Sequence, residues 1–257
     1  MELIKNLYNY RELLKSNVKK EIRGKYKGSF LGVLWSFINP LLQVLVYAII
    51  FPYIMRVQQA DYLQYLICGI IPWTFFTTVM SQGMITVRMN AGIIKKVYFP
   101  REILPISVAT SGLVNFFISC LIILVFCLIG GLGISWHILL LPIVALIQFI
   151  FTLGLVFALS AINIYIKDTE YIVQFIINML FYATPILYSA DLFPKNYRWV
   201  VNINPLSGIV TSYRDIFMYH QIPEANGIVY LIIISVAVFF IGLAIFRKLE
   251  RGFAEEV

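Results

Sequence analysis

Charged side chains are missing from six long stretches of this chain, and each stretch is at least 20 residues long. Crossing the ~30 Å hydrocarbon core of a bilayer takes about 20 helical residues at about 1.5 Å each. Since 60% of the residues are hydrophobic and the mean hydropathy is +0.85, the pattern predicts an all-α integral membrane protein with six transmembrane helices. The spans are placed at about 29–55, 62–87, 104–129, 136–165, 171–189 and 225–246.

The basic residues predict the orientation of these spans. With the N-terminus in the cytoplasm, the inner segments hold 16 of the 20 Lys and Arg residues, and both termini lie in the cytoplasm. The net charge of +7 is then a consequence of membrane topology. Because the spans separate the basic residues from one another, the sequence does not indicate nucleic-acid binding.

The lack of charge inside the spans also limits the chemistry. A proton relay or a membrane-embedded acid–base catalyst needs ionisable groups at depth. The phosphate-binding motif G-x-x-x-x-G-K-[ST] is absent, and the two histidines, His137 and His220, are too far apart to suggest a metal site. We therefore expect no catalytic residue, no metal and no bound cofactor, and a driving force supplied by another protein.

Residues 1–28 precede the first span and are predicted to form an amphipathic basic helix and collar. Apolar residues recur at steps of three and four between basic ones, which is typical of a helix lying in the inner headgroup layer. The basic residues either anchor the chain or recognise an anionic headgroup or diphosphate. The candidates for recognition are Arg11, Lys15, Lys19, Arg23 and Lys25.

The inner loop after the second span is too apolar for a solvated connection. We expect a short helix over 90–101, ended by Pro100, whose exposed aromatic residues need a partner surface. A protein-docking helix is favoured over a helix at the membrane surface. Its candidate residues are Ile94, Lys95, Lys96, Tyr98, Phe99, Arg101 and Glu102.

The outer segment 191–222 contains an uncharged run that is too short to span. It predicts two half-helices at 194–201 and 205–219, and Asn204-Pro205 supplies a cap and a first-turn proline for the second. The segment is either a re-entrant lid over a pathway or a simple outer cap. The lid interpretation assigns an outer gate to Tyr197, Trp199, Asn204 and Pro205.

Polar residues form one stripe on the first span and another on the fifth. Polar side chains in lipid need a neighbouring helix or water, so the stripes are either interhelical hydrogen bonds or the walls of a hydrated pathway. The first stripe is Ser36, Asn39, Gln43 and Tyr47, and the second is Gln174, Asn178 and Tyr182, followed by Tyr188.

Several segments, in order along essentially the whole chain, resemble the permeases of bacterial ABC exporters for polysaccharides, the class of O-antigen and teichoic-acid exporters. No segment is diagnostic alone, but together they are specific. They are YKGSFLGVLW (26–35) with NP (39–40), GIIPWTFF (69–76), IKKVYFPR (94–101), NIYIKD (163–168), TPILY (184–188), YRW (197–199) with NP (204–205), and RKLERGFA (247–254).

The resemblance implies a six-span permease domain over 29–257 that forms a homodimer in the cytoplasmic (inner) membrane. It implies two copies of a separate ATPase subunit, which would bind ATP and Mg²⁺ and dock on the inner loop as a coupling helix. The implied substrate is a lipid-diphosphate-linked glycan, which enters between span one and span five of the partner and contacts Asn39, Gln43, Tyr47, Asn178, Tyr182 and Tyr188.

Two other functions stay open from the residues. One is an ABC permease for efflux of a lipid or small molecule. The other is a membrane-embedded glycan-processing enzyme, which would need acidic residues that converge near one membrane face. The sequence names neither the glycan repeat unit nor its chain length.

Overall fold

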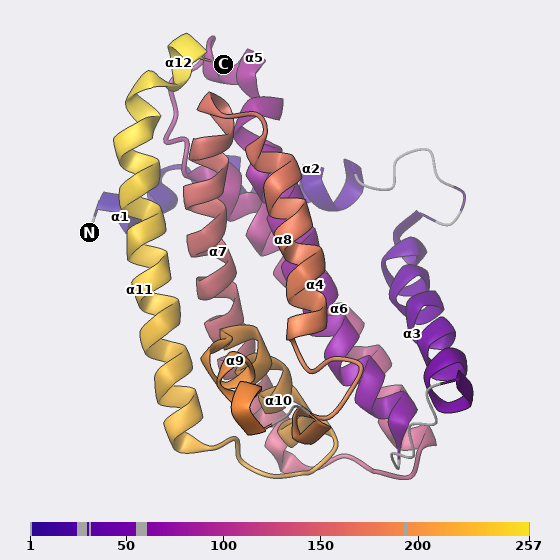
Figure 1. The fold of residues 1–257 in the computed structure, drawn as a ribbon. Helices are drawn as coiled ribbons and strands as arrows, with labels where there is room; N and C mark the ends of the chain where they lie inside the picture. The colour runs from indigo at the N-terminus through magenta and orange to yellow at the C-terminus, as the bar shows by residue number, and fades with distance from the viewer. Residues whose placement is uncertain (1, 25–29, 31, 55–60, 193–194, 257) are drawn as a thin grey trace.

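The computed structural model describes residues 2–24, 30, 32–54, 61–192 and 195–256. Every regular element in these ranges is a helix, which confirms the predicted all-α class. Figure 1 shows long helices running side by side, with shorter ones at both ends of the bundle. Lys25 and Pro194 lie outside the described residues.

Four helical segments are long and apolar enough to cross a membrane. They are Tyr62–Met89, which is α4; Ile103–Ile129, which is α6; Trp136–Tyr165, which comprises η2 (Trp136–Leu140) and α7 (Leu141–Tyr165); and Ala225–Gly252, which comprises α11 (Ala225–Leu249) and η5 (Glu250–Gly252).

Two further helices occupy the first and fifth apolar stretches. α3 (Trp35–Ile54) has 20 residues, follows η1 (Gly32–Leu34) and packs at the edge of the bundle, with Tyr47 against Phe181. It is labelled in Figure 1. α8 (Thr169–Ala183) has 15 residues and covers about 22 Å as a helix. The non-helical chain that follows it, 184–187, is buried, as is required of irregular backbone at membrane depth.

The centre of the bundle is α4, of which one 18-residue window is 78% buried. α7 and α11 also pack closely, because Gly154 and Gly242 face each other. A Cβ on Gly154 would lie 2.6 Å from the Phe239 backbone, and one on Gly242 would clash with the Gly154 carbonyl oxygen. Small residues at a helix crossing permit this approach of two backbones within a membrane.

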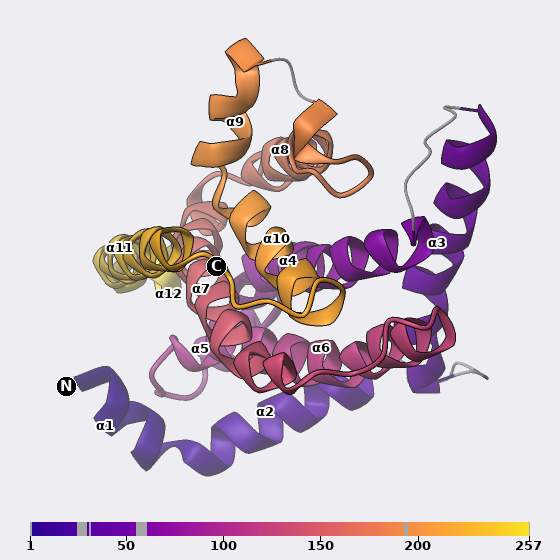
Figure 2. The same ribbon diagram turned by 90° about the horizontal axis from the view of Figure 1, so that it is seen from below.

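The N-terminal segment forms two helices, α1 (Glu2–Asn9) and α2 (Arg11–Gly24), rather than one. They lie across the bundle, and α2 runs alongside α6 in Figure 2. The apolar residues Leu3, Leu7, Tyr10 and Leu14 are half-buried against the core. This is the amphipathic arrangement that the spacing predicts.

The short elements at the two ends of the bundle differ from the expected bounds. The inner helix expected over 90–101 is a single turn, α5 (Ala91–Ile94), followed by turns and an extended segment. At the opposite end of the bundle, η3 (Ala190–Leu192), η4 (Lys195–Tyr197) and α9 (Arg198–Ile203) precede α10 (Pro205–Phe217). The chain ends in α12 (Phe253–Glu256).

Candidate functional site

One face of α4 carries uncharged polar side chains within the membrane-spanning part of the fold. Most of α4 is buried, but one set of residues, spaced three and four apart, is half-exposed. α4 packs against both α3 and α8, and all three are labelled in Figure 2. Because polar groups facing lipid need partners, this face indicates contact with water or with a polar ligand. The set is Thr74, Thr77, Thr78, Ser81 and Gln82.

The stripe on α3 is split between two neighbours. Asn39 is exposed at a cavity of about 130 Å³ between α3, α4 and α6. Farther along α3, the Tyr47 ring stacks on Phe181 of α8 with 6.0 Å between ring centroids, and Gln43 Nε2 lies 3.4 Å from the Tyr47 hydroxyl. The side chain of Ser36 lies outside the described part of the chain.

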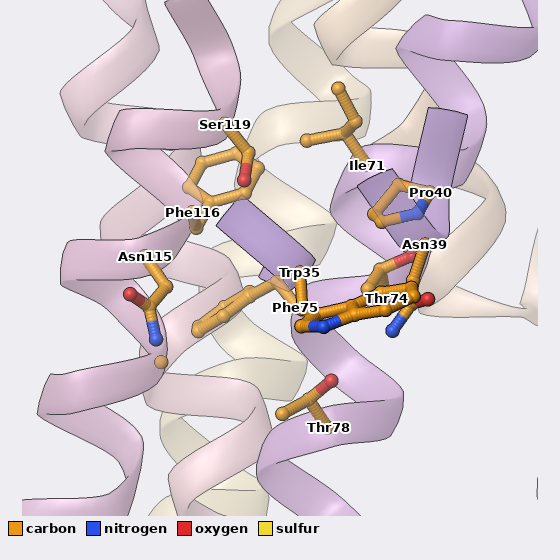
Figure 3. Close-up of a pocket in the computed structure, with 11 residues that line it drawn as sticks. Trp35, Asn39, Pro40, Ile71, Thr74, Phe75, Thr78, Asn115, Phe116 and Ser119 are labelled. Carbon is orange, nitrogen blue, oxygen red and sulfur yellow. The ribbon is translucent and has the colours of Figure 1, made fainter. Parts of the chain in front are cut away.

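Figure 3 shows that polar groups from three helices surround this cavity. Asn39, Thr78, Asn115 and Ser119 line it together with the aromatic residues Trp35, Phe75 and Phe116. A water molecule needs about 10–15 Å³ of such volume and two or more polar partners. The cavity therefore has room for several waters and continues the polar face of α4 towards α3.

The stripe on α8 points mainly outward. Asn178 and Tyr182 are exposed, and Tyr188 is half-buried and donates its hydroxyl to the Tyr182 carbonyl oxygen. Gln174 contacts Ser81 of α4 at 3.3 Å, so this member of the stripe makes an interhelical bond. Within one chain, α3 and α8 meet through the Tyr47–Phe181 contact, and Asn39 lines a cavity to which Asn178 does not belong.

The basic residues of α2 do not converge on one site. Lys15 and Arg11 both pair with Glu12, at 2.9 and 3.8 Å, and Lys15 lowers the pKa of that carboxyl group. Lys19 and Arg23 are exposed.

Lys20 was not among the candidates for headgroup recognition, but its side chain is better placed for that role than theirs. Its Nζ lies 3.3 Å from the Asn90 Oδ1 atom. It lines a cavity of about 320 Å³ between α2 and the inner end of α4, together with Gln82 and Thr86.

The inner loop exposes one of its two aromatic residues. Tyr98 is 90% exposed, whereas Phe99 is only 6% exposed, so the expectation of two exposed aromatics is wrong for Phe99. Ile94 is also buried, while Lys95 and Lys96 are exposed. The loop is therefore held to the bundle by Ile94 and Phe99 and presents Tyr98 to solvent.

The C-terminal end of α11 is bound to this loop. Glu102 is buried and pairs with Arg247 at 3.2 Å, and Arg101 donates to the Glu250 carbonyl oxygen. The Phe253 ring is fully buried, with Arg101 5.8 Å from its centroid. Sequence reasoning assigned no role to this end, although each of the two segments carries both Arg and Glu, which was a usable signal.

Of the two predicted outer helices, α10 begins at the predicted residue, whereas α9 begins at Arg198 instead of 194. Asn204 Oδ1 accepts from the Leu206 amide at 3.0 Å, and Asn204 Nδ2 donates to Thr184 Oγ1 at 2.9 Å. Pro205 occupies the first turn of α10. Tyr197 and Trp199 are exposed on the preceding segments.

α10 itself is part of the core rather than a superficial cap. The buried Tyr213 hydroxyl donates to Gln148 Oε1 at 2.9 Å, and Gln148 Nε2 donates to the Pro72 carbonyl oxygen of α4 at 2.9 Å. Arg214 is 3% exposed and donates to Pro185 O at 2.6 Å and to the Ile186 carbonyl oxygen at 3.0 Å.

Arg214 also contacts α4 directly. Its guanidinium carbon lies 3.4 Å from the centroid of the Tyr65 ring. No carboxylate pairs with Arg214 in the described residues, so backbone carbonyls and this ring hold a buried cation. The network links α10, α7, α4 and the 184–188 segment.

Comparison with known proteins identifies the family. Residues 12–218 match the ABC-2 type transporter model. The chain is 36% identical over 259 residues to the O-antigen export system permease protein RfbA of Myxococcus xanthus, with full coverage of both chains. It is 37% identical to the protein of the same name from Klebsiella pneumoniae, with 97% and 96% coverage. It is also 24% identical to the polysialic acid transport protein KpsM of Escherichia coli over 91% of this chain and 92% of that one. The chain therefore belongs to the ABC-2 type transporter family, as a permease.

Proposed function

We propose that this chain is the membrane permease of an ATP-driven exporter that moves a lipid-diphosphate-linked polysaccharide of the O-antigen class across the cytoplasmic membrane. The full-length similarity to permeases that are named for O-antigen export supports the substrate class. The observation that carries the transport role is the half-exposed polar face of α4, which borders the cavity between α3 and α6 and reaches Gln174 of α8.

The polar face of α4 would form one half of the pathway. A second copy of the chain would cover it, so that Asn39, Gln43 and Tyr47 of one protomer approach Asn178 and Tyr182 of the other. Hydroxyl and amide groups can form hydrogen bonds with sugar hydroxyls. Exposed aromatic rings can contact the sugar rings weakly, so that the glycan moves past them without being bound tightly. Weak, multiple sites of this kind suit conduction.

The membrane topology follows from the same proposal. α3 and α8 would be the first and fifth of six spans, with α8 continued by the buried 184–188 segment. The excess of basic residues on the proposed inner segments supports a cytoplasmic location of both termini. Tyr197, Trp199, Asn204 and Pro205 would form the outer gate.

Energy would come from a separate ATPase subunit, two copies per homodimer, which bind ATP and Mg²⁺ themselves. The docking surface would be α5 and the loop up to Glu102, with Tyr98 as the exposed contact and Lys95, Lys96 and Arg101 beside it. The buried side chains of Ile94 and Phe99 would hold this loop against the bundle.

The basic residues of α2 would attract the diphosphate of the substrate lipid. Surface Lys and Arg residues contribute about 1 kcal/mol each to attraction by anionic headgroups. Lys19 and Arg23 are exposed for this purpose, and Lys20 lines the cavity beside Gln82 and Thr86. Arg11 and Lys15 would contribute less, because Glu12 pairs with both.

The pathway can be tested by cysteine accessibility with the ATPase subunit present. Single cysteines are placed at Thr78 and Ser81 after Cys68, Cys120 and Cys127 have been replaced by alanine. Both should react with a membrane-impermeant thiol reagent in the ATP-free state and become protected when the glycolipid is bound.

The matched control is Leu121→Cys, because Leu121 is 59% exposed on α6, where lipid is expected. It should stay unreactive. Equal reactivity at Leu121 and Ser81 would contradict a pathway along α4. Protection by a free lipid or a small drug, but not by glycolipid, would favour the efflux function instead.

A further inference from the structure

We propose that the ATPase subunit docks on a basic recess shared by the inner loop and the C-terminal end of α11, and that an acidic segment of the ATPase fills it. This proposal rests on the proposed function and adds a second contact to it. Arg251 and Arg247 would then take part in binding the ATPase, together with Tyr98.

Three segments that are distant in the sequence form the recess. A cavity of about 490 Å³ is lined by Tyr10 of the N-terminal helices, by the loop 98–102, and by Arg247, Glu250 and Arg251. A second cavity of about 210 Å³ lies on the other side of Tyr98 and includes Lys95 and Lys96. Tyr98, which is almost fully exposed, therefore stands between two hollows.

The charged side chains around these two cavities indicate what kind of partner would bind there. Five basic side chains line them, but only two acidic ones do, Glu102 and Glu250. Glu102 is already paired with Arg247. Within the described part of the chain, Lys95, Lys96 and Arg251 have no ion-pair partner. An unbalanced basic surface around an aromatic side chain fits an acidic protein segment with an apolar residue at its centre.

The position of the recess, and the packing that holds its loop in place, favour a protein over a lipid headgroup as the binding partner. In Figure 1, α5 and α12 lie at the cytoplasmic end, beyond the level of α1 and α2. The loop is fixed from beneath by buried Phe99 and by the contact of Arg101 with the Phe253 ring. A surface that is already ordered loses little conformational entropy on binding.

The test compares two charge reversals near the end of the chain. Arg251→Glu and Lys248→Glu make the same change in charge at exposed positions three residues apart. Arg251 lines the larger cavity, whereas Lys248 is not among the residues that line either one. Binding of the purified ATPase subunit encoded with this chain is measured on the permease in nanodiscs of phosphatidylcholine, with and without phosphatidylglycerol.

We expect Arg251→Glu to weaken ATPase binding at least about tenfold, Arg251→Lys to restore most of it, and Lys248→Glu to change it less than about threefold. Equal effects of both reversals, or no effect of either, overturn the recess as the docking site. A loss seen only in anionic nanodiscs assigns Arg251 to lipid and also overturns it. Failure of the unmodified permease to bind the ATPase at all would instead contradict the proposed function.

Discussion

Removing the Tyr213 hydroxyl tests whether α10 belongs to the core of the bundle. Tyr213 is fully buried, and its hydroxyl donates to Gln148 Oε1 of α7 at 2.9 Å. Gln148 is 1% exposed and donates in turn to Pro72 of α4. Tyr213→Phe keeps the ring and its contact with Phe116, whose centroid is 5.4 Å away, and it leaves Gln148 Oε1 with no donor.

The expected cost follows from this geometry. A buried acceptor that loses its partner costs about 1–3 kcal/mol. Double-mutant cycles between membrane helices give smaller values, about 0.6 kcal/mol on average and about 1.7 at most. Since both partners are almost completely buried, we expect Tyr213→Phe to lower the free energy of unfolding by about 1–2 kcal/mol.

The measurement is reversible unfolding of the purified permease in mixed micelles with a rising fraction of dodecyl sulfate. Tyr230→Phe is the matched control, because it also removes one hydroxyl bond, to Ile203 O at 2.6 Å, from a partly exposed site. Water can replace that bond, so we expect a loss below about 0.5 kcal/mol.

A double-mutant cycle completes this test. Gln148→Leu in the Tyr213→Phe background removes the stranded amide, so the double variant should cost less than the sum of the two single variants by about 1 kcal/mol. Strict additivity, or a Tyr213→Phe effect no larger than that of Tyr230→Phe, would refute the assignment of α10 to the core through this bond.

Two further predictions concern the inner loop and α2. Tyr98→Ala should reduce ATPase binding and leave the free energy of unfolding unchanged. Phe99→Ala should lower the free energy of unfolding by about 3 kcal/mol, because only Phe99 is buried. Pull-down of the ATPase and unfolding of both variants check this, and identical behaviour of the two variants would contradict it. Replacing Lys15, Lys19 and Arg23 with Glu should lower substrate-stimulated ATP turnover more than basal turnover, and an equal loss of both would indicate an anchoring role.

The parts of the fold that could be predicted from the sequence depend on local rules. Runs without charge identify apolar helices, because a charge at membrane depth is costly wherever it lies along the chain. The Asn204-Pro205 pair identifies the start of α10, because a cap bonds an amide only two residues away. Neither inference requires knowledge of which helices are neighbours.

The errors concern residues whose environment depends on distant partners. Phe99 and Tyr98 are adjacent aromatics with the same local pattern, and only the packing of the loop against the bundle separates a buried ring from an exposed one. Arg214 looks like a residue of an outer loop, but it binds carbonyl groups of Tyr65, Pro185 and Ile186.

The polar face of α4 is a different case, because its signal was present in the sequence. Thr74, Thr78 and Gln82 recur every four residues, and Thr77 and Ser81 lie on the adjoining positions. Threonine and serine hydroxyls can bond the carbonyl group one turn back, as Thr77 does to Thr74, so such residues are common in buried membrane helices. Only the fold shows that these side chains stay half-exposed, beside the cavity between α3 and α6.

The position of α4 suggests how the two ends of the protein are connected. Its 28 residues cover about 42 Å, and its inner end leads directly into α5 and the docking loop. In its other half, the Pro72 carbonyl accepts a hydrogen bond from Gln148 of α7, and the Tyr65 carbonyl accepts one from Arg214 of α10. A displacement of the inner loop therefore acts on the same helix that holds α10 and the 184–188 segment, and the polar face lies between these two ends. If the ATPase docks on the inner loop and the gate lies at α9 and α10, as proposed, this one helix connects the two sites.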